Sequence, residues 1–165
     1  MIPRHVLSLA LLAAAACDPA PSEPTTPNLS DCGPNEGVVA SVIDGDTIVL
    51  ETGEKVRYLM IDTPEITNGH NDCFGEQARE YNEEIALGQT VQLTYDSECT
   101  DKYGRLLAYV ETPDGEANTL MVRRGLACVL YIPPNGSDRE DEFMSLMTDA
   151  REQFEGMWGA CGDPC

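Results

Sequence analysis

The sequence predicts a single α+β domain whose early strands close a small β-barrel. Short apolar segments bounded by Gly, Asp and Pro are typical of strands, and most of them precede the segments with helical spacing. The order is three strands, a helix, two strands and two helices. Residues 32–165 are long enough for one hydrophobic core but not for two.

Three strands are expected first, over Gly37–Ile43, Asp46–Leu50 and Lys55–Ile61. Tight turns at Asp44-Gly45 and Thr52-Gly53 join them, since glycine takes a positive φ without steric cost. Asp46 is not explained by the turn, because it already begins the next apolar segment.

A helix is expected over Phe74–Leu87, and Gly88 ends it. Its apolar face comprises Phe74, Ala78, Tyr81 and Ile85. Strands follow over Thr90–Tyr95 and Arg105–Glu111, and Pro113-Asp114-Gly115 ends the second.

Two more helices complete the domain. Asn118 is expected to cap a short helix that runs to Arg124 and ends at Gly125. Ser137 and Glu140 form the pattern of a capping box at the start of the last helix. The buried stripe of that helix is expected to comprise Phe143, Leu146, Met147, Ala150 and Phe154.

The N-terminus indicates export. Residues 1–16 are predicted to be a signal peptide, because the apolar segment Val6–Ala16 is too short to span a membrane. The stretch LAAAAC resembles a bacterial lipoprotein signal, in which Cys17 is lipidated. Ala14 departs from the usual leucine, so simple secretion is the alternative. Residues 17–31 are rich in Pro, Ser and Thr and are expected to be a tether that holds the domain away from a membrane, in the periplasm or at the cell surface.

Cysteine content and charge restrict the function classes. Six of the seven cysteines remain if Cys17 is lipidated, an even number that is typical of disulfides in an oxidising compartment. No C-x-x-C pair is present, and His70 is the only histidine outside the signal, which argues against a zinc site. The net charge of −19 argues against broad capture of nucleic acid.

Three segments nevertheless carry the residue types that phosphodiester chemistry requires. They are VIDGDTIVL (Val42–Leu50), VRYLMIDTPE (Val56–Glu65) and TDKYGRLLAYV (Thr100–Val110). Carboxylates supply hard oxygen ligands for Ca²⁺ or Mg²⁺, and guanidinium groups bind phosphate oxygens. A further carboxylate can orient or deprotonate an attacking water.

In order and spacing, these motifs resemble the staphylococcal nuclease (thermonuclease) family from about Gly37 to Trp158. The resemblance implies a five-stranded OB-fold barrel with three helices. It also implies that Asp46, Asp62 and the Thr63 carbonyl bind Ca²⁺ and that Asp44 forms a hydrogen bond with a metal-bound water. By the same resemblance, Arg57 and Arg105 would bind the scissile phosphate, and Glu65 would act on the attacking water. Lys102 and Tyr103 would line the neighbouring phosphate, and a base would stack on Tyr131.

The function implied by the resemblance is Ca²⁺-dependent hydrolysis of DNA and RNA by a monomer, leaving 5′-hydroxyl and 3′-phosphate ends. A non-catalytic OB-fold nucleic-acid-binding module and a Ca²⁺-stabilised structural lipoprotein are the alternatives. Neither alternative needs both arginines beside the carboxylates. Only two lysines are present, Lys55 and Lys102, so the surface outside the site is expected to bind DNA weakly.

Six cysteines allow fifteen pairings. The family's fold implies Cys73–Cys99, because the two loops that carry these residues flank the mouth of the active site. It also implies Cys128–Cys161 and, by remainder, Cys32–Cys165.

Overall fold

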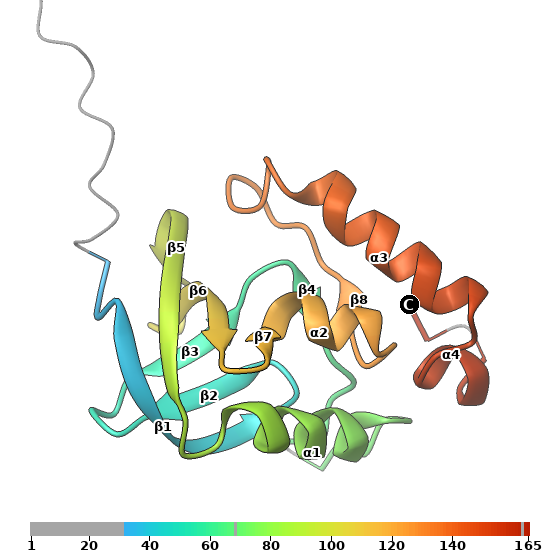
Figure 1. The fold of residues 1–165 in the computed structure, drawn as a ribbon, viewed down its shortest axis with the longest axis horizontal. Coiled ribbons are helices and arrows are strands. Elements are labelled where there is room, and N and C mark those ends of the chain that lie inside the picture. The colour runs from blue at the N-terminus through green and yellow to red at the C-terminus, as the bar shows by residue number, and fades with distance from the viewer. Residues whose placement is uncertain (1–31, 68, 163) are drawn as a thin grey trace, which may run out of the picture.

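The fold is a closed five-stranded barrel with helices packed on two sides (Figure 1). The computed structural model describes residues 32–67, 69–162 and 164–165. The barrel strands are β1 (Glu36–Asp44), β2 (Thr47–Leu50), β3 (Lys55–Tyr58), β5 (Thr90–Thr100) and β6 (Leu106–Thr112). Neighbouring strands follow the order β3-β2-β1-β5-β6, and a parallel pairing of β3 with β6 closes the barrel. This confirms the predicted α+β OB-fold.

The expected third strand is interrupted. β3 ends at Tyr58, and a separate two-residue strand, β4 (Ile61–Asp62), pairs with β8 (Cys128–Val129). The break coincides with Met60, which has a φ of 68°. A non-glycine residue in this left-handed region turns the chain out of the extended conformation. The segment that carries Asp62 therefore leaves the barrel at this point.

The β5–β6 hairpin is longer than predicted. β5 continues five residues beyond Tyr95 to Thr100, and the register shifts between Tyr95 and Thr100. Such an irregularity lets a strand bend while its pairing continues. The short strand β7 (Gly115–Glu116) extends the sheet beyond β6.

Helix α1 (Gly75–Ala86) lies on one side of the barrel, and α2 (Ala117–Arg123), α3 (Glu140–Glu152) and α4 (Met157–Ala160) lie on another (Figure 1). Among the described residues, no helix is long and apolar enough to cross a membrane. The signal peptide and tether predicted for residues 1–31, with Cys17, lie outside the described residues.

Two details predicted for the last helix are wrong. The N-cap of α3 is Arg139, without a side-chain cap, and the Ser137 hydroxyl instead donates to the Pro134 carbonyl at 2.8 Å. Phe154 follows the end of the helix with a φ of 57° and is 74% exposed. Its side chain is therefore not part of the buried stripe, because the helical periodicity stops at Glu152.

Asn118 lies inside α2 and is not its cap, which corrects another prediction. Its side chain is fully buried: Oδ1 accepts a hydrogen bond from the Val110 N–H at 2.9 Å, and Nδ2 donates to the carbonyls of Leu59 at 2.9 Å and Ala108 at 3.3 Å. Buried backbone groups need partners. The amide therefore joins α2 to the barrel.

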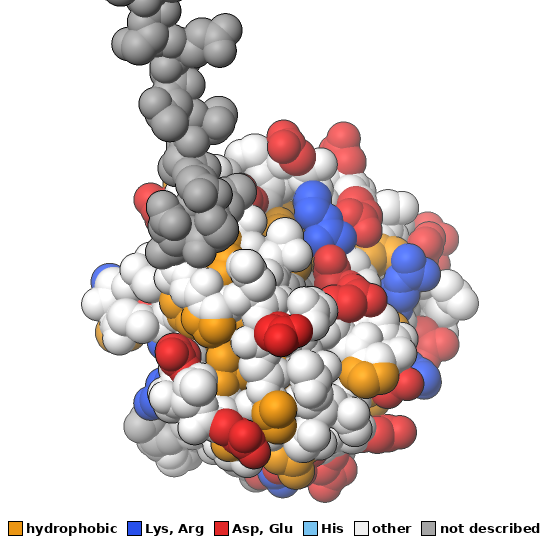
Figure 2. All heavy atoms as spheres, turned by 60° about the vertical axis from the view of Figure 1, so that its left-hand side comes forward, with side chains coloured by type: hydrophobic (Ala, Val, Ile, Leu, Met, Phe, Trp, Pro, Cys, Tyr) orange, Lys and Arg blue, Asp and Glu red, His pale blue; other side chains and the backbone are white. Residues whose placement is uncertain are grey.

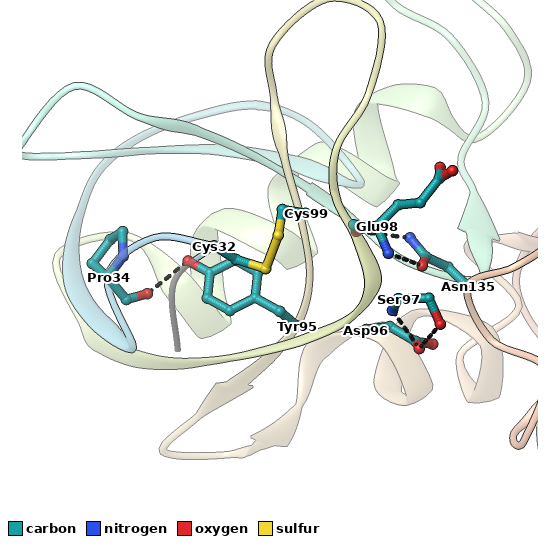
Figure 3. The surroundings of a disulfide bond; sticks show 8 residues. All are labelled: Cys32, Pro34, Tyr95, Asp96, Ser97, Glu98, Cys99 and Asn135. Carbon is teal, nitrogen blue, oxygen red and sulfur yellow. Dashed lines mark hydrogen bonds between the residues drawn. A yellow bond between two sulfur atoms is a disulfide. The ribbon is translucent and has the colours of Figure 1, made fainter. Parts of the chain in front are cut away.

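All three predicted disulfide pairings are wrong; the structure has Cys32–Cys99, Cys73–Cys161 and Cys128–Cys165. Antiparallel pairing of β1 with β5 places the segment before β1 beside the far end of β5. Cys32 therefore lies opposite Cys99, and the Tyr95 hydroxyl donates to the Pro34 carbonyl at 2.7 Å nearby (Figure 3).

The other two disulfides attach the C-terminal residues to the domain. Cys73, just before α1, is bonded to Cys161, just after α4. Cys128 in β8 is bonded to Cys165. The prediction failed because it placed Cys73 and Cys99 together at the mouth of the active site. In the structure, Cys73 precedes α1 and faces the C-terminal segment instead.

We expect Asn118→Ala to lower the free energy of unfolding by about 2–4 kcal/mol, because it leaves a buried backbone donor and acceptor unsatisfied. Chemical denaturation measures the change. Thr148→Ala on the exposed face of α3, which removes one hydrogen bond to the Met144 carbonyl, is the control and should cost less than about 0.5 kcal/mol. An Asn118→Ala protein as stable as this control would contradict the role of the amide.

Candidate active site

The first element of the site is the bend between β1 and β2. The Asp46 N–H donates to Asp44 Oδ1 at 3.1 Å across the turn. Gly45 is needed for close packing, because a Cβ at this position would lie 2.7 Å from Thr63 Cγ2 and 2.8 Å from Ala78 Cβ. The sequence predicted a glycine with positive φ, but Gly45 is not among the glycines that adopt it.

Asn82 holds the bend from α1 and was missed in the sequence. It is fully buried; its Nδ2 donates to the Asp44 carbonyl at 2.9 Å, and its Oδ1 accepts from the Tyr58 hydroxyl at 2.8 Å. The available signal was a polar residue four positions after Ala78, on the face predicted to be apolar. The amide links α1 to the ends of β1 and β3.

Asp46 is almost fully buried, and three hydrogen bonds and one ion pair hold its carboxylate. Oδ1 lies 3.0 Å from Arg57 Nε and accepts from the Thr47 hydroxyl at 3.1 Å. Oδ2 accepts from the Thr63 N–H at 2.8 Å and from its hydroxyl at 3.0 Å. A carboxylate has about four lone-pair positions, so three hydrogen bonds and a neighbouring guanidinium leave little capacity for a further ligand.

Arg57 is held by four acceptors. Besides Asp46, its Nη1 donates to the carbonyls of Tyr58 at 2.8 Å and Ile61 at 2.7 Å, and its Nη2 donates to Asp62 Oδ1 at 2.8 Å. Three of the five N–H groups of the guanidinium are used in these hydrogen bonds, and the Nε–H and one N–H of Nη2 are not. The side chain is 12% exposed, so it cannot rearrange without losing several of these contacts.

Arg105 is positioned by Asp101, a second residue that the sequence did not single out. Asp101 Oδ2 pairs with Arg105 Nε at 2.7 Å, and Oδ1 accepts from the backbone N–H groups of Tyr103 at 2.9 Å and Arg105 at 3.0 Å. Burial alone would raise the pKa of Asp101, but hydrogen bonds from Arg105 hold it below its usual value. The signal that could have identified Asp101 is its position four residues before the oppositely charged Arg105, in a loop that contains glycine.

Glu65 follows the end of β4. Its Oε1 accepts three hydrogen bonds: from the Ile66 N–H at 2.9 Å, and from the N–H and hydroxyl of Thr67, both at 2.6 Å. The bonds from Thr67 lower the pKa of Glu65 below its usual value. Glu65 is therefore a carboxylate at neutral pH, and its second oxygen, Oε2, accepts none of these three bonds.

The structure brings seven predicted site residues together. We name the resulting space of about 170 Å³ the central cavity; it is lined by Asp44, Asp46, Arg57, Asp62, Thr63, Pro64, Glu65 and Arg105. Burial, and then the charge of Asp46, raises the pKa of Asp44 to about 6. Burial also raises the pKa of Asp62, against the opposing charge of Arg57. Excess negative charge is therefore concentrated here.

The donor set of the central cavity fits a hard divalent cation. Carboxylate oxygens of Asp44, Asp46 and Asp62 and the oxygens of Thr63 are the ligand types that Ca²⁺ prefers. A cation would also offset the repulsion from neighbouring carboxylates, which adds to the effect of burial in raising the pKa values of Asp44 and Asp62. Within the described residues, however, no group of three or more His, Cys, Asp or Glu side chains is already arranged around a metal position. Backbone oxygens or waters would therefore complete the ligand set.

Lys102 and Tyr103 lie beside the central cavity. They line a second space of about 470 Å³, which shares Arg57 and Arg105 with the central cavity and which we name the Tyr103 cavity. Tyr103 is 73% exposed, with Lys102 Nζ 5.0 Å from its ring centre. Tyr131 does not line this cavity; its two chain neighbours do, and its hydroxyl lies 3.2 Å from Ser137 Oγ.

Comparison with known proteins identifies the family. The model of the staphylococcal nuclease homologue family matches residues 55–160. Thermonuclease from Staphylococcus intermedius is 35% identical over 123 residues, which cover 72% of this chain and 70% of that protein. Endonuclease YncB from Bacillus subtilis is 38% identical over 127 residues, 73% of this chain and 60% of that protein. An uncharacterized endonuclease from Escherichia coli is 34% identical over 131 residues, which cover 77% of this chain and 79% of that protein. This chain therefore belongs to the staphylococcal nuclease homologue family.

Proposed function

We propose that this protein is a Ca²⁺-dependent nuclease that hydrolyses phosphodiester bonds in DNA and RNA. The observation that carries the proposal is the central cavity, where carboxylates and two arginines from three separate segments meet. The names of the relatives, thermonuclease and endonuclease, support the same activity. Neither a structural lipoprotein nor a non-catalytic binding module needs this combination of charges.

Asp46, Asp62 and the Thr63 carbonyl are the proposed Ca²⁺ ligands, and Asp44 is proposed to hold a water on the ion. When bound, Ca²⁺ supplies positive charge that stabilises the phosphate oxygens as negative charge builds on them. Because four groups already contact the Asp46 oxygens, the ion is proposed to replace one of these contacts. The ion pair with Arg57 is the contact whose loss is useful, since the guanidinium charge then acts on a phosphate oxygen while the other hydrogen bonds of Arg57 stay in place.

The arginines are proposed to bind the scissile phosphate from two sides. Arg57 has two N–H groups outside its hydrogen bonds, on Nε and Nη2, and Arg105 keeps its Nη groups beyond the pair that its Nε makes with Asp101. Guanidinium donors that face a developing charge in a dry cavity stabilise the transition state. Asp101 pairs with Arg105 and Asp62 with Arg57, and these pairs help to hold both guanidinium groups in place.

Glu65 is proposed to orient the attacking water through Oε2. The water oxygen bonds to phosphorus, the bond from phosphorus to the 5′ oxygen breaks, and that oxygen takes up a proton to become the 5′-hydroxyl. The phosphate stays on the 3′ oxygen, and Glu65 or solvent accepts the proton of the water. With its lowered pKa, Glu65 is a weak base, so orientation is its main contribution.

Substrate capture is expected to depend on the cavities themselves. Acidic side chains outnumber basic ones on the face shown in Figure 2. Arg79 and Arg139, which lie away from the site, are already paired with glutamates. Affinity from counterion release grows with the number of phosphates that a protein neutralises. We therefore propose a small electrostatic footprint centred on Arg57, Arg105 and Lys102.

We expect Arg105→Ala to lower the rate of DNA cleavage about 100- to 1,000-fold while the protein stays folded, as for other donors to a developing charge. Arg57→Ala is a less specific test, because it also leaves the buried Asp46 unpaired. Initial rates and circular dichroism are measured together. Arg79→Ala on α1 is the matched control and should cleave at the wild-type rate. A folded Arg105→Ala protein with the wild-type rate would overturn the phosphate-binding role.

We expect Ca²⁺ to raise the melting temperature, because a ligand that binds only the folded state stabilises it, by about 2.7 kcal/mol at 100 times its Kd. Asp46→Ala should abolish the shift. Thermal unfolding is followed with Ca²⁺ and with a chelator, and Asp114→Asn at the exposed β6–β7 turn is the control. An Asp46→Ala protein that responds to Ca²⁺ as the wild type does would remove Asp46 from the ligand set.

We propose that the protein is exported and attached to a bacterial membrane through Cys17. Three disulfides within the described residues are compatible with an oxidising compartment. Cys17→Ser should move the protein from the membrane to the soluble fraction, since several acyl chains anchor a protein stably where one does not. Mass spectrometry of the processed N-terminus gives the modification directly. An unmodified Cys17 in membrane-free protein would indicate simple secretion.

A further inference from the structure

A third space, of about 390 Å³, adjoins the central cavity on the side of Glu65. It is lined by Asp62, Thr63, Pro64, Glu65, Asp72, Cys73, Cys128, Cys161 and Pro164. We name it the disulfide-walled cavity, because half-cystines of two disulfides line it. Its volume falls within the range of about 300–1,000 Å³ that is typical of small-molecule sites.

The three cavities follow one another. The disulfide-walled cavity shares residues 62–65 with the central cavity, and the Tyr103 cavity shares Arg57 and Arg105 with it. The two outer cavities have no lining residue in common. A phosphodiester in the central cavity would therefore have one space on each side for its two nucleosides.

The walls of the disulfide-walled cavity are fixed in place. Cys73–Cys161 joins the start of α1 to the residue after α4, and Cys128, which pairs with Asp62 across β4 and β8, is bonded to Cys165. Asp72 accepts a hydrogen bond from the Glu65 N–H at 3.2 Å, and its own N–H donates to the Glu65 carbonyl at 2.9 Å. Preformed walls reduce the entropy lost when a ligand binds.

The charges of the two outer cavities differ in sign. Carboxylates of Glu65 and Asp72 line the disulfide-walled cavity, together with Asp62, whose charge the proposed Ca²⁺ would offset, and neither Lys nor Arg is among its lining residues. Arg57, Lys102 and Arg105 line the Tyr103 cavity. The disulfide-walled cavity therefore suits an uncharged sugar and base and disfavours a second phosphate, because like charges repel at close range.

The direction of attack assigns one nucleoside to each space. In an in-line displacement the leaving oxygen departs on the side opposite the attacking water. Glu65, which is proposed to orient that water, lines the disulfide-walled cavity and not the Tyr103 cavity. The leaving 5′ oxygen and its nucleoside are thus directed to the Tyr103 cavity. The nucleoside that keeps the phosphate is then directed to the disulfide-walled cavity.

We propose that the disulfide-walled cavity binds the nucleoside on the 5′ side of the cleaved bond and that its carboxylates select against a terminal 5′-phosphate on that nucleoside. The inference rests on the proposed nuclease function and adds a substrate preference to it. An internal phosphodiester carries one negative charge and can turn to solvent, whereas a terminal phosphate carries up to about two. The preference is therefore greatest at the 5′ end of a strand.

The test compares two dinucleotides, thymidylyl-thymidine with a free 5′-hydroxyl and the same molecule with a 5′-phosphate. We expect the 5′-phosphate to lower kcat/KM about tenfold, the size of effect that one nearby like charge produces in a partly screened site. Asp72→Asn, which keeps an acceptor for the Glu65 N–H, should reduce this discrimination several-fold. Asp114→Asn, which removes the same charge from an exposed turn, should leave it unchanged.

The outcomes separate the two proposals. Equal kcat/KM for the two dinucleotides, in an enzyme that digests DNA, would overturn the substrate preference and leave the nuclease function standing. Discrimination that Asp72→Asn does not reduce would remove this cavity as its source. Failure to cleave either dinucleotide or long DNA would remove the nuclease function and the inference that rests on it.

Discussion

The site depends on a largely buried arginine. Arg57 on β3 is 12% exposed, and a guanidinium cannot lose its charge in a protein, so acceptors must surround it. The chain supplies them by breaking the strand at Met60, which leaves the carbonyls of Tyr58 and Ile61 on the same nitrogen, Nη1. The remaining acceptors are Asp46 and Asp62. The arrangement of the candidate site is thus also what makes burial of this cation possible.

The same network determines the charge of the central cavity. Carboxylates from two loops face only two guanidinium groups, and the pKa values of Asp44 and Asp62 are raised as a result of burial and of neighbouring carboxylates. A closed barrel holds these loops, so the carboxylates cannot move far apart. Under the proposed function, such a cavity would stabilise a bound cation and, through its arginines, the phosphate that accompanies it. This is how an acidic protein would act on a polyanion at one point of its surface.

Local pattern was enough to predict the cores of the barrel strands and α1, and the resemblance to the family predicted seven of the residues that line the central cavity. Alternating apolar residues and glycine turns determine the strands. Each of the three motifs, around Asp46, Arg57 and Arg105, is a short segment of consecutive residues. Features that depend on contacts between distant segments were missed or wrong. Asn82 and Asn118 satisfy backbone groups of the barrel, and no local pattern distinguishes this from capping or an exposed polar residue.

The disulfides show the same limit. Which cysteines meet depends on how far β5 extends and where the C-terminal residues return, and neither can be derived from the spacing of cysteines. Cys99 lies on the strand extension that the periodicity failed to predict. The resemblance to a family supplied the barrel and the site but not the positions of these terminal segments.

The central claim is that this cavity hydrolyses phosphodiesters with the help of Ca²⁺. The most direct test is the initial rate of DNA digestion by the purified domain, residues 32–165, in Ca²⁺ and again after chelation. Digestion in Ca²⁺, its loss on chelation and its return when Ca²⁺ is restored are the expected results. An equal rate in chelator, or no digestion in Ca²⁺ by protein shown to be folded, would contradict the account.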